Sequence, residues 1–102
     1  MAKKLPPVHP GEVLREEFLR PMNLTPYAVA GAVGVPRTRI ERLVRKQTSL
    51  TADTALRLAR YFGTSPAFWM GIQTQYELEC AEDSLAATLR KISPARAAKP
   101  AA

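Results

Sequence analysis

The sequence predicts an all-α protein of five helices in one compact domain. Three stretches of helical apolar spacing each follow a hydroxyl residue suited to cap a helix N-terminus, namely Thr25, Thr51 and Ser65. Gly34 and Gly63 close two of these stretches, as C-terminal caps do. A chain of 102 residues with 46% apolar content is long enough for one modest core.

The chain is expected to begin with an extended arm over residues 1–9, because prolines there interrupt regular hydrogen bonding. A first helix is predicted from Gly11 to Arg20, ending before Pro21. His9 is expected to cap this helix or to lie in the loop before it. The side chains expected to face inward are Val13, Leu14 and Phe18, and those expected to face outward are Glu12, Glu16 and Glu17.

The stretch from Thr25 to Lys46 reads as two short helices joined by a tight turn at Gly34. Thr25 followed by Pro26 is a helix start, because the hydroxyl accepts from a free amide and proline suits the first helical position. The predicted motif is therefore a helix-turn-helix. Its apolar side is formed by Val29, Ala30, Val33, Ile40, Leu43 and Val44.

The outer face of the second helix of this motif is basic, with five cations and one anion, Glu41. We expect no ladder of Glu/Lys pairs four residues apart to neutralise this charge. Unpaired cations on one face favour a polyanionic partner, and outward Arg and Thr can read bases in the major groove of DNA. A solvated charged face is the alternative. The candidate DNA-binding residues are Thr25, Arg37, Thr38, Arg39, Arg42, Arg45 and Lys46. Of these, Thr38 and Arg42 are assigned to bases, and Thr25, Arg39, Arg45 and Lys46 mainly to phosphate.

A fourth helix is predicted from Ala52 to Phe62, and a fifth from Pro66 to about Glu82. The expected inner stripe of the fourth is Ala55, Leu56, Ala59 and Phe62, with Arg57 and Arg60 facing either phosphate or solvent. The fifth carries more large apolar groups than one core stripe needs, so a homodimer interface is the expectation, although a core position is the alternative for some of them. The candidate dimer residues are Phe68, Ile72, Tyr76 and Leu78. A weak sixth helix is expected after Asp83 within a tail, residues 83–102, that is weakly helical to disordered.

Composition excludes several classes of function. The net charge of +6 and a sequence pI of about 10.0 favour an anionic partner. No apolar run approaches the roughly 18 residues that span a bilayer, and the N-terminus lacks a signal-peptide core, so a cytoplasmic protein is expected. One Cys and one His cannot form an internal disulfide or a zinc site of several Cys and His ligands. Without a catalytic motif, we expect no enzyme, no cofactor and no small-molecule substrate.

Three segments carry a more specific resemblance, over about residues 8–82. They are HPGEVLREEFLRPMNLT at the front, the turn around Gly34, and the run from Leu50 to Leu78, LTADTALRLARYFGTSPAFWMGIQTQYEL. With these segments the chain resembles the HigA family of addiction-module antitoxins, in the wider group of phage-repressor-like (XRE) helix-turn-helix proteins. The resemblance implies a compact repressor-like fold.

The resemblance further implies a homodimer that represses its own operon by binding double-stranded operator DNA. It also implies that the protein neutralises a RelE/HigB-like toxin, a small ribonuclease that cuts messenger RNA on the ribosome. Acidic side chains of the first helix would meet such a basic toxin, on a surface expected to lie away from the recognition helix; these candidates are Glu12, Glu16 and Glu17. The acidic group from Glu77 to Asp83 is a second possibility, and a solvated face is the alternative for both.

The sequence departs from this family pattern at two places. Pro26 stands where relatives often carry a Gln that bridges base and phosphate. Arg45 and Lys46 stand where many have Asn-Gly, so the recognition helix is expected either to run longer or to end in strain. Two other functions are compatible with the sequence: a phage-like transcriptional repressor without a toxin partner, and a protein-interaction module that inhibits a partner and binds DNA weakly or not at all.

Overall fold

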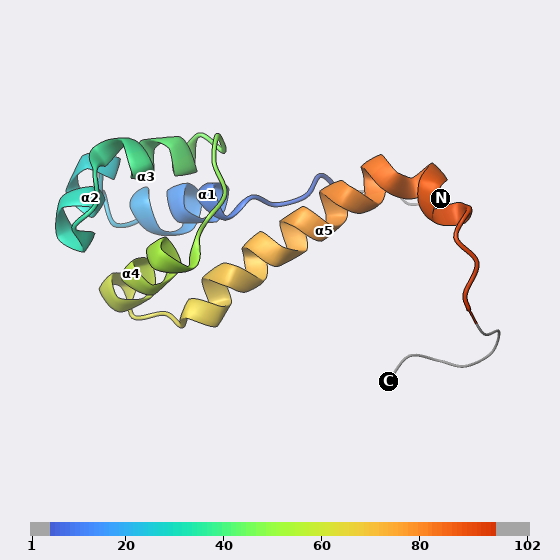
Figure 1. Ribbon diagram of the computed structural model, residues 1–102. Helices are drawn as coiled ribbons and strands as arrows, with labels where there is room; N and C mark the ends of the chain where they lie inside the picture. The colour runs from blue at the N-terminus through green and yellow to red at the C-terminus, as the bar shows by residue number, and fades with distance from the viewer. Residues whose placement is uncertain (1–4, 96–102) are drawn as a thin grey trace.

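The computed structural model describes residues 5–95 and is built from helices (Figure 1). The five predicted helices are present, the first of them divided into an α-helical and a π-helical part. Helices α1 to α4 gather into a globular body, and α5 starts against that body and projects from it. The elements are α1 (Pro10–Val13), η1 (Leu14–Leu19), α2 (Pro26–Val33), α3 (Arg37–Val44), α4 (Ala52–Phe62) and α5 (Pro66–Arg90).

The first helix begins one residue earlier than predicted, at Pro10, and His9 caps it. The Nδ1 atom of His9 accepts a hydrogen bond from the Gly11 amide at 2.9 Å. This confirms the capping role expected for His9. The π-helical second half, η1, was not predicted; its last turn is closed by the Arg20 amide, which donates to the Arg15 carbonyl at 3.0 Å.

The helix-turn-helix is formed as predicted by α2 and α3. The Thr25 hydroxyl accepts from the Ala28 amide at 3.1 Å, and Gly34 adopts a left-handed conformation with φ 77°. The recognition helix α3 ends at Val44, and Lys46 then takes a φ of 61°. A side chain in this left-handed region is strained, which confirms the second of the two outcomes expected where the family pattern has glycine.

The core lies between the first helix, the helix-turn-helix, α4 and the start of α5. Leu14, Ile40, Leu58 and Trp69 are fully buried there. The Trp69 indole donates to the Thr64 hydroxyl at 2.7 Å, which satisfies its one polar atom. The predicted stripe of α4 was wrong at one position. Leu56 is 58% exposed, and Leu58 is buried instead. The buried side of α4 is formed by Thr54, Ala55, Leu58 and Ala59.

Helix α5 is longer than predicted. The prediction of an end near Glu82 and a separate sixth helix was wrong, because no Gly or Pro interrupts the chain there and α5 continues to Arg90. Trp69 and Gln73 are its buried residues, both in its first half, and the second half extends into solvent (Figure 1). Residues 83–90 of the predicted tail are therefore helical, and its last residues, 96–102, lie outside the described part of the chain, as do residues 1–4 of the predicted arm.

Candidate nucleic-acid interface

The recognition helix α3 presents the outer face that its sequence predicts. Its inner residues Ile40 and Leu43 are 0% and 2% exposed, so the rotation of the helix about its axis is fixed by packing. The side chains at the centre of the opposite face are all exposed to solvent. They are Thr38, Arg42 and Arg45, with Arg37, Arg39 and Lys46 exposed beside them.

The first helix holds the C-terminal end of α3 in place. A Cβ atom added at Gly11 would lie 1.7 Å from the carbonyl oxygen of Leu43, so only glycine permits this close approach of the two backbones. Arg15 donates from Nη1 to the Val44 carbonyl at 2.7 Å and thus satisfies an acceptor at the helix end. Sequence reasoning missed both roles. The HPG run at residues 9–11 was the available signal for Gly11.

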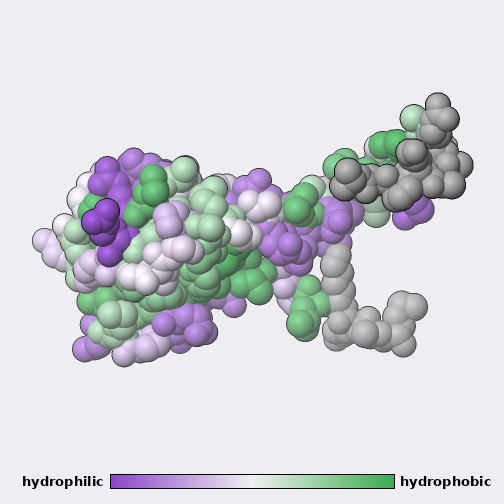
Figure 2. Space-filling view, turned by 90° about the horizontal axis from the view of Figure 1, so that it is seen from below, coloured by the Kyte–Doolittle hydropathy of each residue, from purple (hydrophilic) through white to green (hydrophobic). Residues whose placement is uncertain are grey.

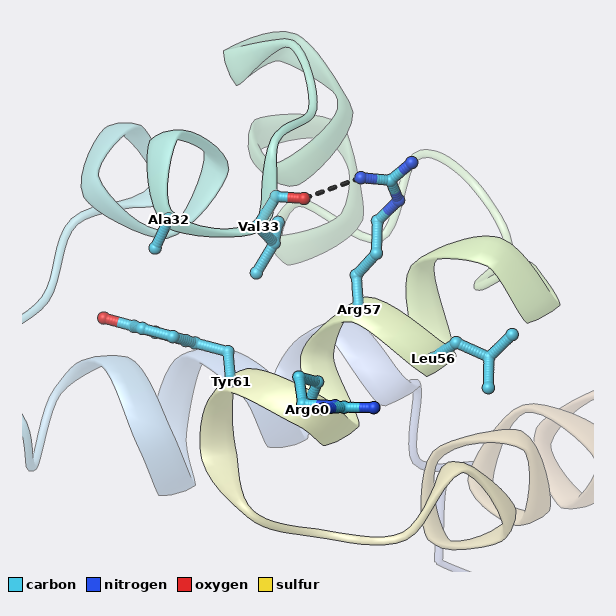
Figure 3. A pocket seen from close by; sticks show the side chains of 6 residues that line it. All are labelled: Ala32, Val33, Leu56, Arg57, Arg60 and Tyr61. Carbon is cyan, nitrogen blue, oxygen red and sulfur yellow. Dashed lines mark hydrogen bonds between the residues drawn. The ribbon is translucent and has the colours of Figure 1, made fainter.

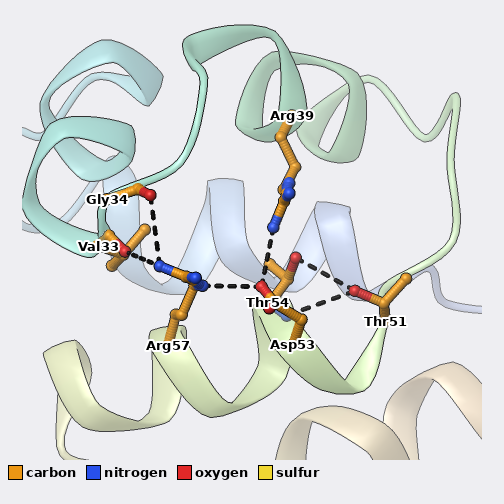
Figure 4. A network of polar contacts seen from close by, with 7 residues as sticks. All are labelled: Val33, Gly34, Arg39, Thr51, Asp53, Thr54 and Arg57. Carbon is orange, nitrogen blue, oxygen red and sulfur yellow. Dashed lines mark hydrogen bonds and ion pairs between the residues drawn. The ribbon is translucent and has the colours of Figure 1, made fainter.

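Helix α4 holds the other side of the motif through one carboxylate (Figure 4). The Oδ1 atom of Asp53 accepts from Arg39 Nη1 at 2.8 Å and from Arg57 Nε at 2.7 Å. Arg57 also donates from Nη1 to the carbonyls of Val33 at 2.7 Å and Gly34 at 3.3 Å, which ends α2. The hydrogen bond from Arg57, with the charges of Arg57 and Arg39, holds the pKa of Asp53 below its ordinary value.

Arg57 was expected to face phosphate or solvent, and the structure gives it this bridging role instead. Arg60, by contrast, is exposed, beside an open pocket of about 500 Å³ between α2 and α4 (Figure 3). The pocket is lined mainly by apolar side chains, with the two guanidinium groups at its edge. Its lining residues are Ala32, Val33, Leu56, Arg57, Arg60 and Tyr61.

The cations of α3 differ in how far their charge is already balanced. Arg37 pairs with Glu41, four residues on, at 3.3 Å, and this single pair is not the neutralising ladder whose absence was expected. Lys46 lies 3.9 Å from Glu12 of the first helix. Within residues 5–95, Arg42 and Arg45 form no ion pair, which leaves two unbalanced charges on the outer face.

The acidic side chains of the first helix do not lie uniformly away from α3. The expectation was wrong for Glu12, which faces Lys46 at the end of the recognition helix. Glu16 is bound by Arg15 at 2.8 Å and lies 3.3 Å from Arg20, and the hydrogen bond from Arg15 is the main cause that lowers its pKa. Glu17 is exposed on η1. The three candidate toxin-binding residues are thus in different electrostatic surroundings.

The four candidate dimer residues do not form one patch on the surface. Phe68 and Ile72 line an apolar groove of about 530 Å³ together with Val8 and Val13. Tyr76 is partly buried, and its ring packs edge-on against His9 with centroids 4.8 Å apart. Leu78 is 54% exposed and lies on the projecting half of α5, where hydrophobic side chains stand among hydrophilic ones (Figure 2).

Leu78 belongs to a second apolar stripe along α5. At about 100° per residue, Leu78, Leu85 and Leu89 lie within about 40° of one another around the helix axis. Leu85 and Leu89 are 44% and 45% exposed. Sequence reasoning had assigned Leu85 and Leu89 to a separate helix and so did not connect them with Leu78.

Two further properties concern the described residues as a whole. Across residues 5–95, no helix is long and apolar enough to cross a membrane. In the same range, no group of three or more His, Cys, Asp or Glu side chains is arranged to hold a metal ion.

Comparison with known proteins places this architecture in a family. A helix-turn-helix family model matches residues 14–69. Virulence-associated protein I of Dichelobacter nodosus is 52% identical over 79 residues, which cover 78% of this chain and 73% of that protein. Antitoxin HigA-1 of Vibrio cholerae is 43% identical over 72 residues, which cover 71% of this chain and 68% of that protein.

Solved structures give the same result at the level of the fold. Pseudomonas aeruginosa antitoxin HigA, solved with the higBA promoter, superposes with a TM-score of 0.85 at 41% identity, over 88% of this chain and 99% of that one. Antitoxin GraA in complex with its operator superposes with a TM-score of 0.85 at 34% identity, over 95% of this chain and 99% of that one. The chain therefore belongs to the helix-turn-helix family and, within it, to the HigA antitoxins.

Proposed function

We propose that this protein is the antitoxin of a toxin-antitoxin module, which represses its own operon by binding operator DNA and neutralises a RelE/HigB-like toxin that cleaves messenger RNA. The observation that carries the DNA-binding part is the exposure of Thr38, Arg42 and Arg45 on a recognition helix fixed by its neighbours. Relatives of the same fold were solved with a promoter and with an operator, which supports this function.

On DNA, Thr38 and Arg42 contact base edges in the major groove, because they occupy the centre of the exposed face. Arg45 and Lys46 contact phosphate at the end of α3, and Thr25 does so at the start of α2, where free amides and the helix dipole favour an anion. Arg37 and Arg39 also contact phosphate, and each must first leave the carboxylate with which it is paired.

The protein binds DNA as a homodimer through α5, with recognition helices one turn of DNA apart, roughly 34 Å. The apolar groove at Phe68 and Ile72 and the exposed Leu78 supply surface for this contact, with Tyr76 at its edge. One helix-turn-helix makes few contacts, so pairing two half-sites is the ordinary route to selective binding.

The toxin is a basic protein, and this chain silences it by covering its RNA-binding or active surface in the cytoplasm, without modifying it. On η1, Glu17 is exposed and Glu16 is paired with Arg15 and Arg20, whereas Glu12 is paired with Lys46. Opposite charge increases the rate of encounter, while buried apolar contacts supply most of the affinity.

Co-expression with the neighbouring gene of the operon tests this function. That gene alone should arrest growth, and this chain should restore it. A variant with Glu16 and Glu17 changed to lysine should restore growth less well. A neighbour that is harmless by itself contradicts the antitoxin function and favours a phage-like transcriptional repressor without a toxin partner.

A further inference from the structure

The cation Arg39 lies near the outer face of the recognition helix, but its guanidinium is turned towards α4. At about 100° per residue, Arg39 is about 60° around the helix from Arg42. Its Nη1 atom is 2.8 Å from Oδ1 of Asp53, and both side chains are about half exposed, at 43% and 56%. A DNA phosphate can therefore reach the same guanidinium, and phosphate and Asp53 compete for it.

Asp53 is held on α4 in a fixed position by a second arginine. Arg57 donates to the same Oδ1 at 2.7 Å, and its Nη1 is bound by the carbonyls of Val33 and Gly34 (Figure 4). Arg57 thus has two carbonyl partners that do not depend on the charge of Asp53. The part of the network that DNA can change is the pair of Arg39 and Asp53.

We propose that Asp53 is a specificity-determining residue: it withholds Arg39 from DNA phosphate and so lowers binding to sequences other than the operator. The proposal rests on the proposed DNA-binding function. Non-specific binding gains nearly all its free energy from phosphate contacts, so one more available cation adds the full free energy of a phosphate contact there. On the operator, base contacts from Arg42 and Thr38 fix the depth and register of α3, so a released Arg39 gains less.

The test measures binding to a duplex from the chain's own promoter and to a scrambled duplex of equal length, over a range of salt. Asp53→Asn should raise affinity for scrambled DNA about three- to tenfold and for promoter DNA less than twofold, so the ratio of the two falls. The slope of log affinity against log salt on scrambled DNA should steepen by about 0.9, the value of one added phosphate contact.

Two variants distinguish the release of Arg39 from a general effect of the change in net charge. Adding Arg39→Gln to Asp53→Asn should return the scrambled-DNA affinity and slope to those of the unchanged protein. Glu17→Gln changes net charge by the same unit on η1, outside this network, and should leave the ratio unchanged. The inference is overturned if Asp53→Asn and Glu17→Gln raise binding to both duplexes by one common factor.

Two further controls distinguish a loss of folding, or a failure of the proposed DNA-binding function, from failure of the inference itself. Asp53 lies in the first turn of α4, so thermal unfolding of Asp53→Asn must be recorded beside the binding curves. If that variant does not fold, Arg39→Gln alone decides: the proposal expects an unchanged scrambled-DNA slope, and a slope flattened by about 0.9 overturns it. An unchanged protein that does not distinguish promoter from scrambled DNA contradicts the proposed DNA-binding function itself, and the inference with it.

Discussion

The backbone of Gly11 in the first helix packs directly against the carbonyl group of Leu43 in the recognition helix. A Cβ atom at Gly11 would lie 1.7 Å from the Leu43 carbonyl oxygen and 2.6 Å from its carbon. Because the obstacle is backbone, no rotamer change relieves it, and any side chain at this position must push the two helices apart. The position of α3 thus depends on the absence of a side chain one helix away.

Gly11→Ala should therefore lower the free energy of unfolding by about 1–3 kcal/mol, the range for groups forced into a packed interior. Thermal unfolding measures this, and a loss of 1 kcal/mol corresponds to about 4–8 °C for a domain of this size. Gly31→Ala on α2 is the matched control, because a Cβ there meets no atom within 4 Å. Equal unfolding temperatures for the two variants would contradict the steric account.

The His9 cap predicts how stability depends on pH. Burial is the main cause that lowers the pKa of His9 below its ordinary value of about 6.5, and the neutral ring must keep Nδ1 free to accept from Gly11. The unfolded chain therefore binds this proton more readily than the folded one. The free energy of unfolding should be highest above about pH 6.5 and should fall as the pH drops below it.

Measuring urea unfolding between pH 5 and 8 tests this expectation. His9→Asn is the control, because an amide oxygen can accept from Gly11 and does not titrate in this range. His9 is the single histidine of the chain, so the slope should be largely lost in the variant. A variant with the same slope as the unchanged protein would assign the titration to another group.

At Lys46, unlike at Gly11, the expected gain in stability comes from introducing a glycine. Its φ of 61° is costly for a residue with a side chain, by roughly 1–2 kcal/mol. Lys46→Gly should thus be more stable than Lys46→Ala by about 1 kcal/mol after the greater freedom of glycine in the unfolded chain is deducted. Both variants lose the contact with Glu12, so their comparison in thermal unfolding isolates the backbone.

The readout by α3 is tested by comparing two arginines that lack an ion pair within residues 5–95. Arg42→Ala should weaken operator binding by about 1–3 kcal/mol and relax specificity at one base pair, because it removes a contact to a base edge. Arg45→Ala should weaken operator and scrambled DNA alike and flatten the salt slope by about one. If Arg42→Ala weakened both duplexes equally, its assignment to a base would be wrong.

Local signals made the helices of the body and the turn of the motif predictable from the sequence. Thr25, Thr51 and Ser65 each cap the helix they were expected to cap, and Gly34 and Gly63 have the positive φ of a left-handed C-terminal cap. Such features depend on a few neighbouring residues. Their physical causes can be read directly from the order of residue types.

Contacts between distant segments were not predictable in the same way. The bond from Arg15 to Val44 joins residues 29 apart, and the bond from Arg57 to Val33 joins residues 24 apart. No spacing rule connects such positions, because the pairing depends on how helices pack. For the same reason the exposed face of α3 was predictable, whereas the carboxylates that already balance Arg39 and Lys46 were not.

The apolar surface of α5 leads to the last prediction, which concerns the homodimer. Leu78, Leu85 and Leu89 form an exposed stripe on a half-helix that projects from the body, and water contact with such a stripe is unfavourable unless a partner covers it.

Leu78→Glu should therefore shift the sedimentation of the protein at micromolar concentration from dimer to monomer. Because Leu78 is 54% exposed, the monomer should remain folded, with an unchanged helical circular-dichroism signal. Ser84→Glu, an exposed position about 120° around the helix from Leu78, adds the same charge away from the stripe and should leave the dimer largely intact. A Leu78→Glu protein that sediments as the unchanged protein does would exclude this stripe from the interface and leave the groove at Phe68 and Ile72 as its place.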